Sequence, residues 1–138
     1  MKQSNTPKIL GSFELVTFPE FGISDITAKI DTGADTGALH CTKIRLEETP
    51  KGKVLAFSPF DHPEIEIRAD NFAAKFVRSS NGDRQERYFI NTTIEIHGKN
   101  YPIALSLADR SDMKWPVLIG RRFLHKHNFL VDVSKVKP

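Results

Sequence analysis

Residues 84–108 constrain the fold of this chain more than any other segment. They contain two runs, 84–96 and 101–108, in which apolar or β-branched residues recur at every second position. This period of two is typical of a strand that buries one of its faces. Gly98-Lys99-Asn100 lies between the two runs and is typical of a tight turn. The segment therefore predicts a long antiparallel hairpin, which makes a β-sheet protein the first expectation.

The remaining periodic segments are short, and turn-forming residues separate them. The one convincing helix spans residues 120–128 and is about two turns long. Short strands with regular turns and one short helix near the end predict an all-β protein, either a closed β-barrel or a sandwich. The further expected strands cover residues 8–18, 26–30, 39–46, 54–57, 65–67, 71–77, 116–119 and 129–133.

Length and composition indicate a single domain that covers residues 1–138. With 39% hydrophobic residues the chain can bury a modest core, and we expect residues 1–7 to be disordered. No apolar run is long enough to cross a membrane, and the first residues lack the apolar core of a signal peptide. We therefore expect a cytoplasmic protein without a membrane partner, or a periplasmic one if a leader has been removed.

Cys41 is the single cysteine of the chain, which excludes an internal disulfide. This cysteine usage suits a reducing compartment. No suitably spaced partner suggests a set of metal ligands around it. We therefore expect Cys41 to pack as a small apolar residue.

The net charge of +3 is distributed unevenly along the chain. Residues 1–77 carry a net charge of −2, whereas residues 78–138 carry +5. This excess is too mild for a nucleic-acid-binding arm, and the basic half lacks interleaved exposed aromatic residues, so we expect no nucleic acid partner. The charge favours an acidic ligand, with ordinary solvated surface as the alternative.

The tripeptide Asp31-Thr32-Gly33 follows the expected strand 26–30 directly. A carboxylate at the end of a rigid strand is well placed to meet a substrate. Gly33 lets the backbone turn and leaves no Cβ in the way of a molecule that lies close above it. The alternative is an Asx turn, in which Asp31 hydrogen-bonds the backbone two residues further on. The tripeptide alone leaves both interpretations open.

Two segments far apart in the chain resemble the signature segments of retropepsins, the single-lobe aspartic proteases of the retroviral type. They are Ile30-Asp31-Thr32-Gly33-Ala34-Asp35 and Val117-Leu118-Ile119-Gly120-Arg121-Arg122-Phe123-Leu124. The resemblance implies a closed, single-lobe β-barrel with one short C-terminal helix. It also implies an ion pair between Arg121 and Asp35 that locks the acid-bearing loop to the helix. The roles that it implies are catalysis for Asp31, Thr32 and Gly33, substrate binding for Ala34 and Asp35, and structural support for Gly120 and Arg121.

Within the retropepsins, the chain is more similar to a bacterial group whose members have carried the label "ATP-dependent zinc protease". The similar segments are 36–40, 78–82 and 115–122. Some members of this group are associated with ATP-grasp glutamate ligases, which implies a functional link to such a ligase. The sequence contains neither a Gly-x-x-x-x-Gly-Lys-Ser/Thr loop for ATP nor a His-Glu-x-x-His helix for zinc, so we expect no cofactor and no metal.

The aspartic protease mechanism requires two carboxyl groups, one ionised and one protonated. The chain has a single Asp-Thr-Gly, and neither Asp109-Arg110-Ser111 nor Asp132-Val133-Ser134 offers a second. A working site would therefore require a homodimer, in which Asp31 of each copy meets its counterpart on a two-fold axis. The expected partners are thus a second copy of the chain and a peptide substrate.

The segment 78–87 is the candidate flap, a hairpin that closes over the substrate and excludes water. Its tip, Ser79-Ser80-Asn81-Gly82-Asp83, replaces the glycine-rich apolar tip of retroviral enzymes. The nearby arginines Arg78, Arg84 and Arg87 favour an acidic substrate or a C-terminal carboxylate, although a solvated hairpin explains them equally well. The expected substrate-binding residues of this segment are Arg78, Ser79, Ser80, Asn81 and Arg87.

The function predicted from the sequence is that of a homodimeric aspartic endopeptidase, in which Asp31 activates water. Two alternatives stay open at this point. A non-catalytic module with the same fold would bind extended peptides and tolerate the loss of Asp31. A zinc-dependent peptidase would be sensitive to chelators and indifferent to Asp31→Asn.

Overall fold

The computed structural model describes residues 8–78, 82–109 and 114–138. Eleven strands and one short helix make up the described part of the chain. They are β1 Lys8–Leu10, β2 Phe13–Phe18, β3 Ile23–Ile30, β4 Gly37–Thr49, β5 Gly52–Pro59, β6 Ile67–Ala69, β7 Phe72–Arg78, β8 Arg84–Ile96, β9 Lys99–Ala108, β10 Val117–Ile119, α1 Arg121–Lys126 and β11 Phe129–Val131.

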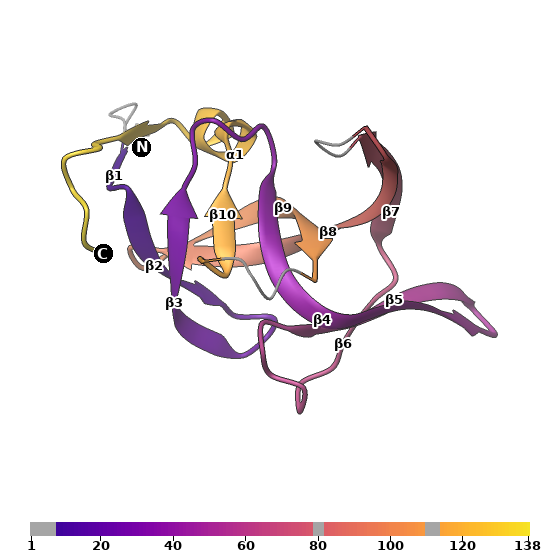
Figure 1. Cartoon of the computed structure of the whole chain (residues 1–138). Coiled ribbons are helices and arrows are strands. Elements are labelled where there is room, and N and C mark those ends of the chain that lie inside the picture. The colour runs from indigo at the N-terminus through magenta and orange to yellow at the C-terminus, as the bar shows by residue number, and fades with distance from the viewer. Residues whose placement is uncertain (1–7, 79–81, 110–113) are drawn as a thin grey trace, which may run out of the picture.

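Six strands close into a barrel in the order β10, β3, β2, β8, β9 and β4, and the pairing of β4 with β10 completes the circle (Figure 1). The predicted all-β closed barrel with one short helix is thereby confirmed. The barrel encloses a core of aliphatic and aromatic side chains contributed by all six strands. Cys41 belongs to this core and is fully buried, as predicted.

The hairpin predicted from residues 84–108 is present as β8 and β9. These strands pair antiparallel from Ile96↔Lys99 to Phe89↔Ser106. The alternating residues point into the barrel, because Ile94, Ile96 and Leu105 have at most 1% of their surface exposed. The alternation in the sequence was therefore a correct guide to both the hairpin and its buried face.

The single strand predicted over residues 8–18 is wrong. The chain breaks at Gly11 and Ser12, so that β1 pairs with β11 in a separate two-stranded sheet while β2 joins the barrel. The C-terminal tail causes this break, because the Ser12 N–H donates to the Lys135 carbonyl at 2.7 Å. A side chain at position 11 would meet that same carbonyl at 2.8 Å, so the tail can pack here only against glycine.

The helix is shorter than the predicted 120–128. Gly120 stays extended (φ −94°, ψ −179°), and Asn128 has a left-handed φ of 59° that ends the helical segment. The first two helical N–H groups, of Arg121 and Arg122, donate to carbonyls of the loop after β3. The start of α1 is thus fixed by that loop and not by a capping side chain.

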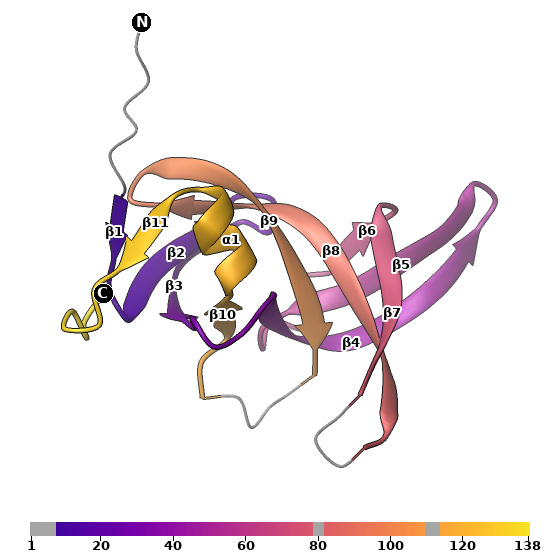
Figure 2. The same cartoon turned by 90° about the horizontal axis from the view of Figure 1, so that it is seen from above.

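Two hairpins extend beyond the barrel, β4–β5 and β7–β8 (Figures 1 and 2). Strand β6 pairs with β5 and begins two residues later than the predicted strand 65–67. The described residues contain no helix with the length and apolarity to cross a bilayer.

Candidate active site

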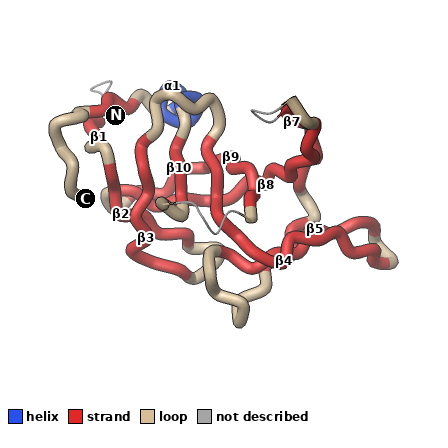
Figure 3. Tube along the Cα trace, in the orientation of Figure 1, coloured by secondary structure: helices blue, strands red, loops and turns tan. Residues whose placement is uncertain are grey.

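The loop 31–36, here called the acid loop, connects β3 to β4 beside the start of α1 (Figure 3). Strand β10 lies between the two strands that carry this loop. It pairs parallel with β3, with Ile119 opposite Ile30, and antiparallel with β4, with Leu118 opposite Ala38. Both ends of the acid loop are therefore anchored on the same short apolar strand.

The backbone of Asp31 is held from both sides. Its N–H donates to the Ile119 carbonyl at 2.8 Å, and the preceding N–H of Ile30 donates to the Ser12 carbonyl at 2.9 Å. Its own carbonyl accepts the Ala34 N–H at 3.2 Å, which closes the turn. Asp31 is half-buried, whereas Thr32 and Gly33 are exposed at the surface. The loop thus presents a carboxyl group from a backbone with little freedom to move.

The side chain of Asp31 also makes the Asx turn that was the alternative interpretation of the tripeptide. The Gly33 N–H donates to Asp31 Oδ1 at 3.0 Å. Among the described residues, no donor contacts the other carboxylate oxygen, Oδ2. The turn and a chemical role are therefore compatible, because the turn orients the carboxyl group and leaves one oxygen for water or substrate.

Two glycines allow the acid loop to approach β10 and α1 closely. A Cβ on Gly120 would lie 2.8 Å from the Asp35 carbonyl oxygen and 2.9 Å from that of Ala34. A Cβ on Gly37 would overlap the Leu118 carbonyl. These contacts are with backbone atoms, which cannot swing aside as a flexible side chain can. The structural support expected of Gly120 thus has a specific steric basis.

The carboxylate of Asp35 is shared between two arginines at the start of α1. Arg122 Nε lies 3.0 Å from Asp35 Oδ2, whereas Arg121 Nη2 lies 3.8 Å from Oδ1. Arg121 also donates from Nη1 to the Thr32 carbonyl at 3.2 Å. The expected ion pair between Arg121 and Asp35 is therefore present, but Arg122 makes a second and shorter ion pair with the same carboxylate. Together the two arginines tie both halves of the acid loop to α1.

The candidate flap is a longer hairpin than residues 78–87. Strands β7 and β8 pair antiparallel from Phe72↔Ile90 to Arg78↔Arg84. The Arg84 guanidinium lies 4.4 Å from the ring centre of Phe76, which is 62% exposed, and Arg87 is half-buried opposite Lys75. The predicted substrate-binding residues Ser79, Ser80 and Asn81 lie outside the described residues.

A cavity of about 380 Å³ lies between the β7–β8 hairpin, β9, α1 and the end of the acid loop. Its lining includes Thr36, Lys75, Arg122 and Lys126, none of which was assigned a role from the sequence. The spacing of Arg122 and Lys126 was the available signal, because residues i and i+4 share one face of a helix. Lys75 belongs to a distant strand, and no local pattern connects it to α1.

Three histidines outside the acid loop and the cavity lining contact carboxylates, and the single cysteine is buried. His40, His62 and His97 each lie within 3.1 Å of a carboxylate oxygen, of Asp61, Glu64 and Glu14 respectively. Burial raises the pKa of the Cys41 thiol to about 12. In the described part of the chain, no group of three or more His, Cys, Asp or Glu side chains is placed to hold a metal ion.

The sequence from residue 9 to residue 137 matches the family described as the retropepsin-like aspartic endopeptidase RimB. A "Probable alpha-L-glutamate ligase" from Shewanella pealeana is 30% identical over 139 residues, which cover 96% of this chain and 30% of that protein. A protein of the same name from Desulfotalea psychrophila is 29% identical over 128 residues, which cover 88% of this chain and 27% of that protein. This chain thus spans less than a third of the length of these relatives.

Among solved structures, a Legionella pneumophila protein of unknown function is similar over 95% of both chains. The TM-score is 0.74 and the sequence identity is 24%. At this identity the likeness concerns the fold, and it agrees with the single-lobe barrel described above.

Proposed function

The chain belongs to the RimB-like family of retropepsin-like aspartic endopeptidases, and on this basis we propose that it hydrolyses peptide bonds with Asp31 as its catalytic carboxyl group. The observation that carries the proposal is the way the acid loop is held. The N–H of Asp31 is fixed to β10, and Gly120 and the two arginines of α1 clamp the residues that follow. A carboxyl group held in this way is already oriented, so no further loss of conformational entropy is needed at the moment of reaction.

The active site is formed by two copies of the chain. Each copy contributes one Asp31, and two carboxyl groups about 3 Å apart share a single proton because they cannot both be ionised. The exposure of Thr32 and Gly33 supports this arrangement, because it leaves the tip of the acid loop accessible to a partner.

The two-stranded sheet β1–β11 offers a further surface for this dimer. Ile9 and Leu130 are opposite each other in its register and are 50% and 55% exposed. Among the described residues, neither strand has a second strand as partner. A free edge with adjacent exposed aliphatic side chains favours the addition of strands from a second copy.

In this dimer, the ionised carboxylate takes a proton from a water molecule. At the same time the oxygen of that water attacks the peptide carbonyl carbon. The protonated carboxyl of the partner donates a hydrogen bond to the carbonyl oxygen, on which negative charge develops. The proton that was taken from water is then delivered to the nitrogen of the leaving amine. Thr32 holds the two loops in register across the axis, and the β7–β8 hairpin covers the bound peptide.

The substrate is an acidic peptide. The arginines of the hairpin, Arg84 and Arg87, carry positive charge on the element that covers the substrate. The two curated relatives described above are named as glutamate ligases, which fits a functional link between this peptidase and a ligase that forms glutamyl bonds. A product rich in glutamate would present the carboxylates that these arginines attract.

The test is cleavage of a diverse peptide mixture by the wild type and by Asp31→Asn, with products identified by mass spectrometry. Asp25→Asn is the matched control, because it removes the same charge from an exposed residue of β3. We expect wild type and Asp25→Asn to cut, with a preference for acidic peptides, and Asp31→Asn to be inactive while melting at the wild-type temperature.

Cleavage by Asp31→Asn at the wild-type rate would overturn the role of Asp31. If a chelator then abolished that cleavage, the zinc-dependent alternative would be indicated. Peptide binding without cleavage by any of these proteins, at concentrations where they are dimeric, would indicate a peptide-binding module instead.

A further inference from the structure

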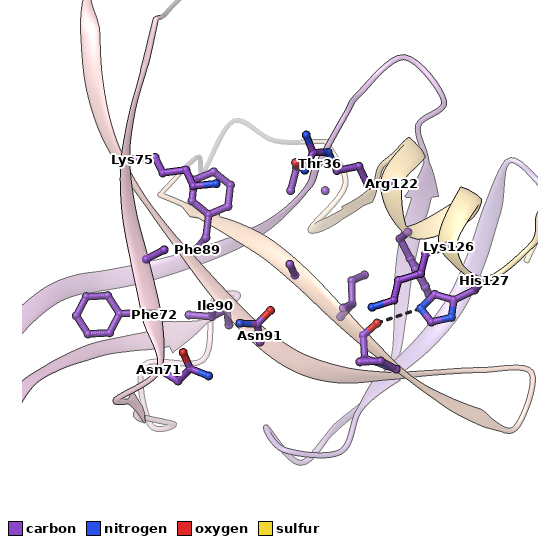
Figure 4. A pocket seen from close by; sticks show the side chains of 16 residues that line it. Thr36, Asn71, Phe72, Lys75, Phe89, Ile90, Asn91, Arg122, Lys126 and His127 are labelled. Atoms are coloured by element: carbon purple, nitrogen blue, oxygen red, sulfur yellow. Dashed lines mark hydrogen bonds between the residues drawn. The ribbon is translucent and has the colours of Figure 1, made fainter.

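The cavity between α1, β9 and the β7–β8 hairpin has a strongly one-sided charge. Lys75, Arg122 and Lys126 line it, and no acidic side chain is among the described residues of its wall. Figure 4 shows Lys75 on the hairpin at one side of the cavity, and at the other Lys126 on α1 with His127 directly after it. We refer to it as the basic pocket.

Two of the three cations in the basic pocket have no compensating anion among the described residues. Arg122 pairs with Asp35 at 3.0 Å, outside the pocket wall. Lys75 lies 5.2 Å from the ring centre of Phe89, and within the described ranges neither Lys75 nor Lys126 makes an ion pair. Uncompensated positive charge that converges on a concave surface favours the binding of an anion.

Part of the lining of the basic pocket is apolar. Phe72, Ile90, Ile103 and Phe123 belong to its lining, and a volume of about 380 Å³ is large enough for an amino-acid side chain with part of its backbone. His127 adds no stable charge, because burial lowers the pKa of its imidazole. The chemistry of the pocket thus matches a carboxylate on a short aliphatic stem better than a compact inorganic anion.

The position of the basic pocket connects it to the acid loop. Thr36 and Gly37, which follow Asp35 directly in the chain, form part of its wall. The opposite wall is the hairpin that serves as the candidate flap. Arg122 links the two places, since it lines the pocket and also pairs with Asp35. A peptide that lies along the acid loop can therefore place an outlying residue in this pocket.

We infer that the basic pocket is a specificity subsite, in which Lys75 and Lys126 bind a carboxylate of the peptide substrate at a position away from the bond that is cut. The carboxylate belongs to a glutamate or aspartate side chain of the peptide. This inference rests on the proposed function, because it gives the pocket its role in selecting substrates for the Asp31 site.

The test measures binding and not cleavage, so that it does not depend on catalysis. The protein is the Asp31→Asn variant, and the probes are tetraglutamate, tetraglutamine and free glutamate, titrated by calorimetry at low salt. Lys75→Gln and Lys126→Gln are each introduced into this background. Lys53→Gln is the matched control, because Lys53 is exposed on β5 and does not line the pocket.

We expect each pocket substitution to weaken tetraglutamate binding about 3- to 10-fold, the size of effect typical of the net contribution of one hydrogen bond, with the control unchanged. Tetraglutamine should bind weakly and equally to all variants. Equal weakening by Lys53→Gln would overturn the inference, because the attraction would then be general surface charge. Binding of free glutamate as tight as that of tetraglutamate would also overturn it, since the pocket would then serve a free amino acid. If wild type proved inactive while this pattern held, the proposed function alone would fail.

Discussion

Substitution of Gly120 by alanine tests how closely the acid loop depends on its support. The added Cβ would lie 2.8 Å from the Asp35 carbonyl oxygen, 2.9 Å from the Ala34 carbonyl oxygen and 2.9 Å from the Thr36 carbonyl carbon. Ordinary contact begins near 3.4 Å, so these three backbone atoms must each retreat by about half an ångström. The φ of Gly120 is −94°, so the backbone conformation itself suits alanine and only the clash matters.

The expected cost follows from two opposing effects. Inserting one methyl group into a packed site costs about 1–3 kcal/mol, whereas a change from glycine to alanine recovers about 0.4–1 kcal/mol by restricting the unfolded chain. The free energy of unfolding should therefore fall by about 1–2 kcal/mol, which lowers the melting temperature by roughly 4–8 °C for a domain of this size. Peptidase activity should fall much further, because a displacement of the acid loop misplaces Asp31.

The assay is thermal unfolding followed by circular dichroism, together with peptide cleavage. Gly33→Ala is the matched control for stability, because a Cβ there would meet only a side-chain oxygen, Asp31 Oδ1, at 3.3 Å. Its melting temperature should stay near that of the wild type. A Gly120→Ala protein that melts and cleaves like the wild type would refute the argument that close backbone contact fixes the acid loop.

Three further predictions concern other parts of the molecule. Asp35→Asn removes two exposed ion pairs, so it should lower the free energy of unfolding, measured by urea titration, by less than about 1 kcal/mol. It should strongly reduce peptide cleavage, and an unchanged cleavage rate would contradict the role of these ion pairs in holding the acid loop. Cys41 should react with Ellman's reagent at pH 8 only after unfolding, and rapid labelling of the folded protein would contradict this. Because burial raises the pKa of the Cys41 thiol, the free energy of unfolding should also fall as the pH rises above about 9 toward 12. Activity per chain should fall on dilution as the dimer dissociates, and a constant specific activity would argue against the shared site.

The parts of the fold that could be predicted are those with a local signal. The alternation over 84–108 specified a hairpin and its buried face, because the period of two follows from strand geometry alone. The apolar run 116–119 likewise indicated a strand, and β10 covers residues Val117–Ile119 of it. The resemblance to retropepsins implied structural support for Gly120, and the structure gives the reason, since a larger residue would collide with the acid loop.

The parts that could not be predicted depend on contacts between distant segments. The break at Gly11 arises because the tail near Lys135 packs against it, and nothing in residues 8–18 shows that tail. The Asp35 carboxylate makes ion pairs with two neighbouring arginines, and this depends on the exact direction of the first helical turn. The basic pocket joins Lys75 of β7 to Lys126 of α1, and only the closed barrel brings these residues to one cavity.

The most direct test of a shared Asp31 site is subunit mixing. A fixed amount of wild type is incubated with a threefold excess of Asp31→Asn, and the cleavage rate is compared with that after adding the same excess of Asp25→Asn. If two Asp31 side chains form each site, random pairing should lower the activity of the wild-type chains to about one quarter with Asp31→Asn. The Asp25→Asn addition should raise total activity instead. A rate that is unchanged by the Asp31→Asn excess would show that each chain works alone and would contradict the account.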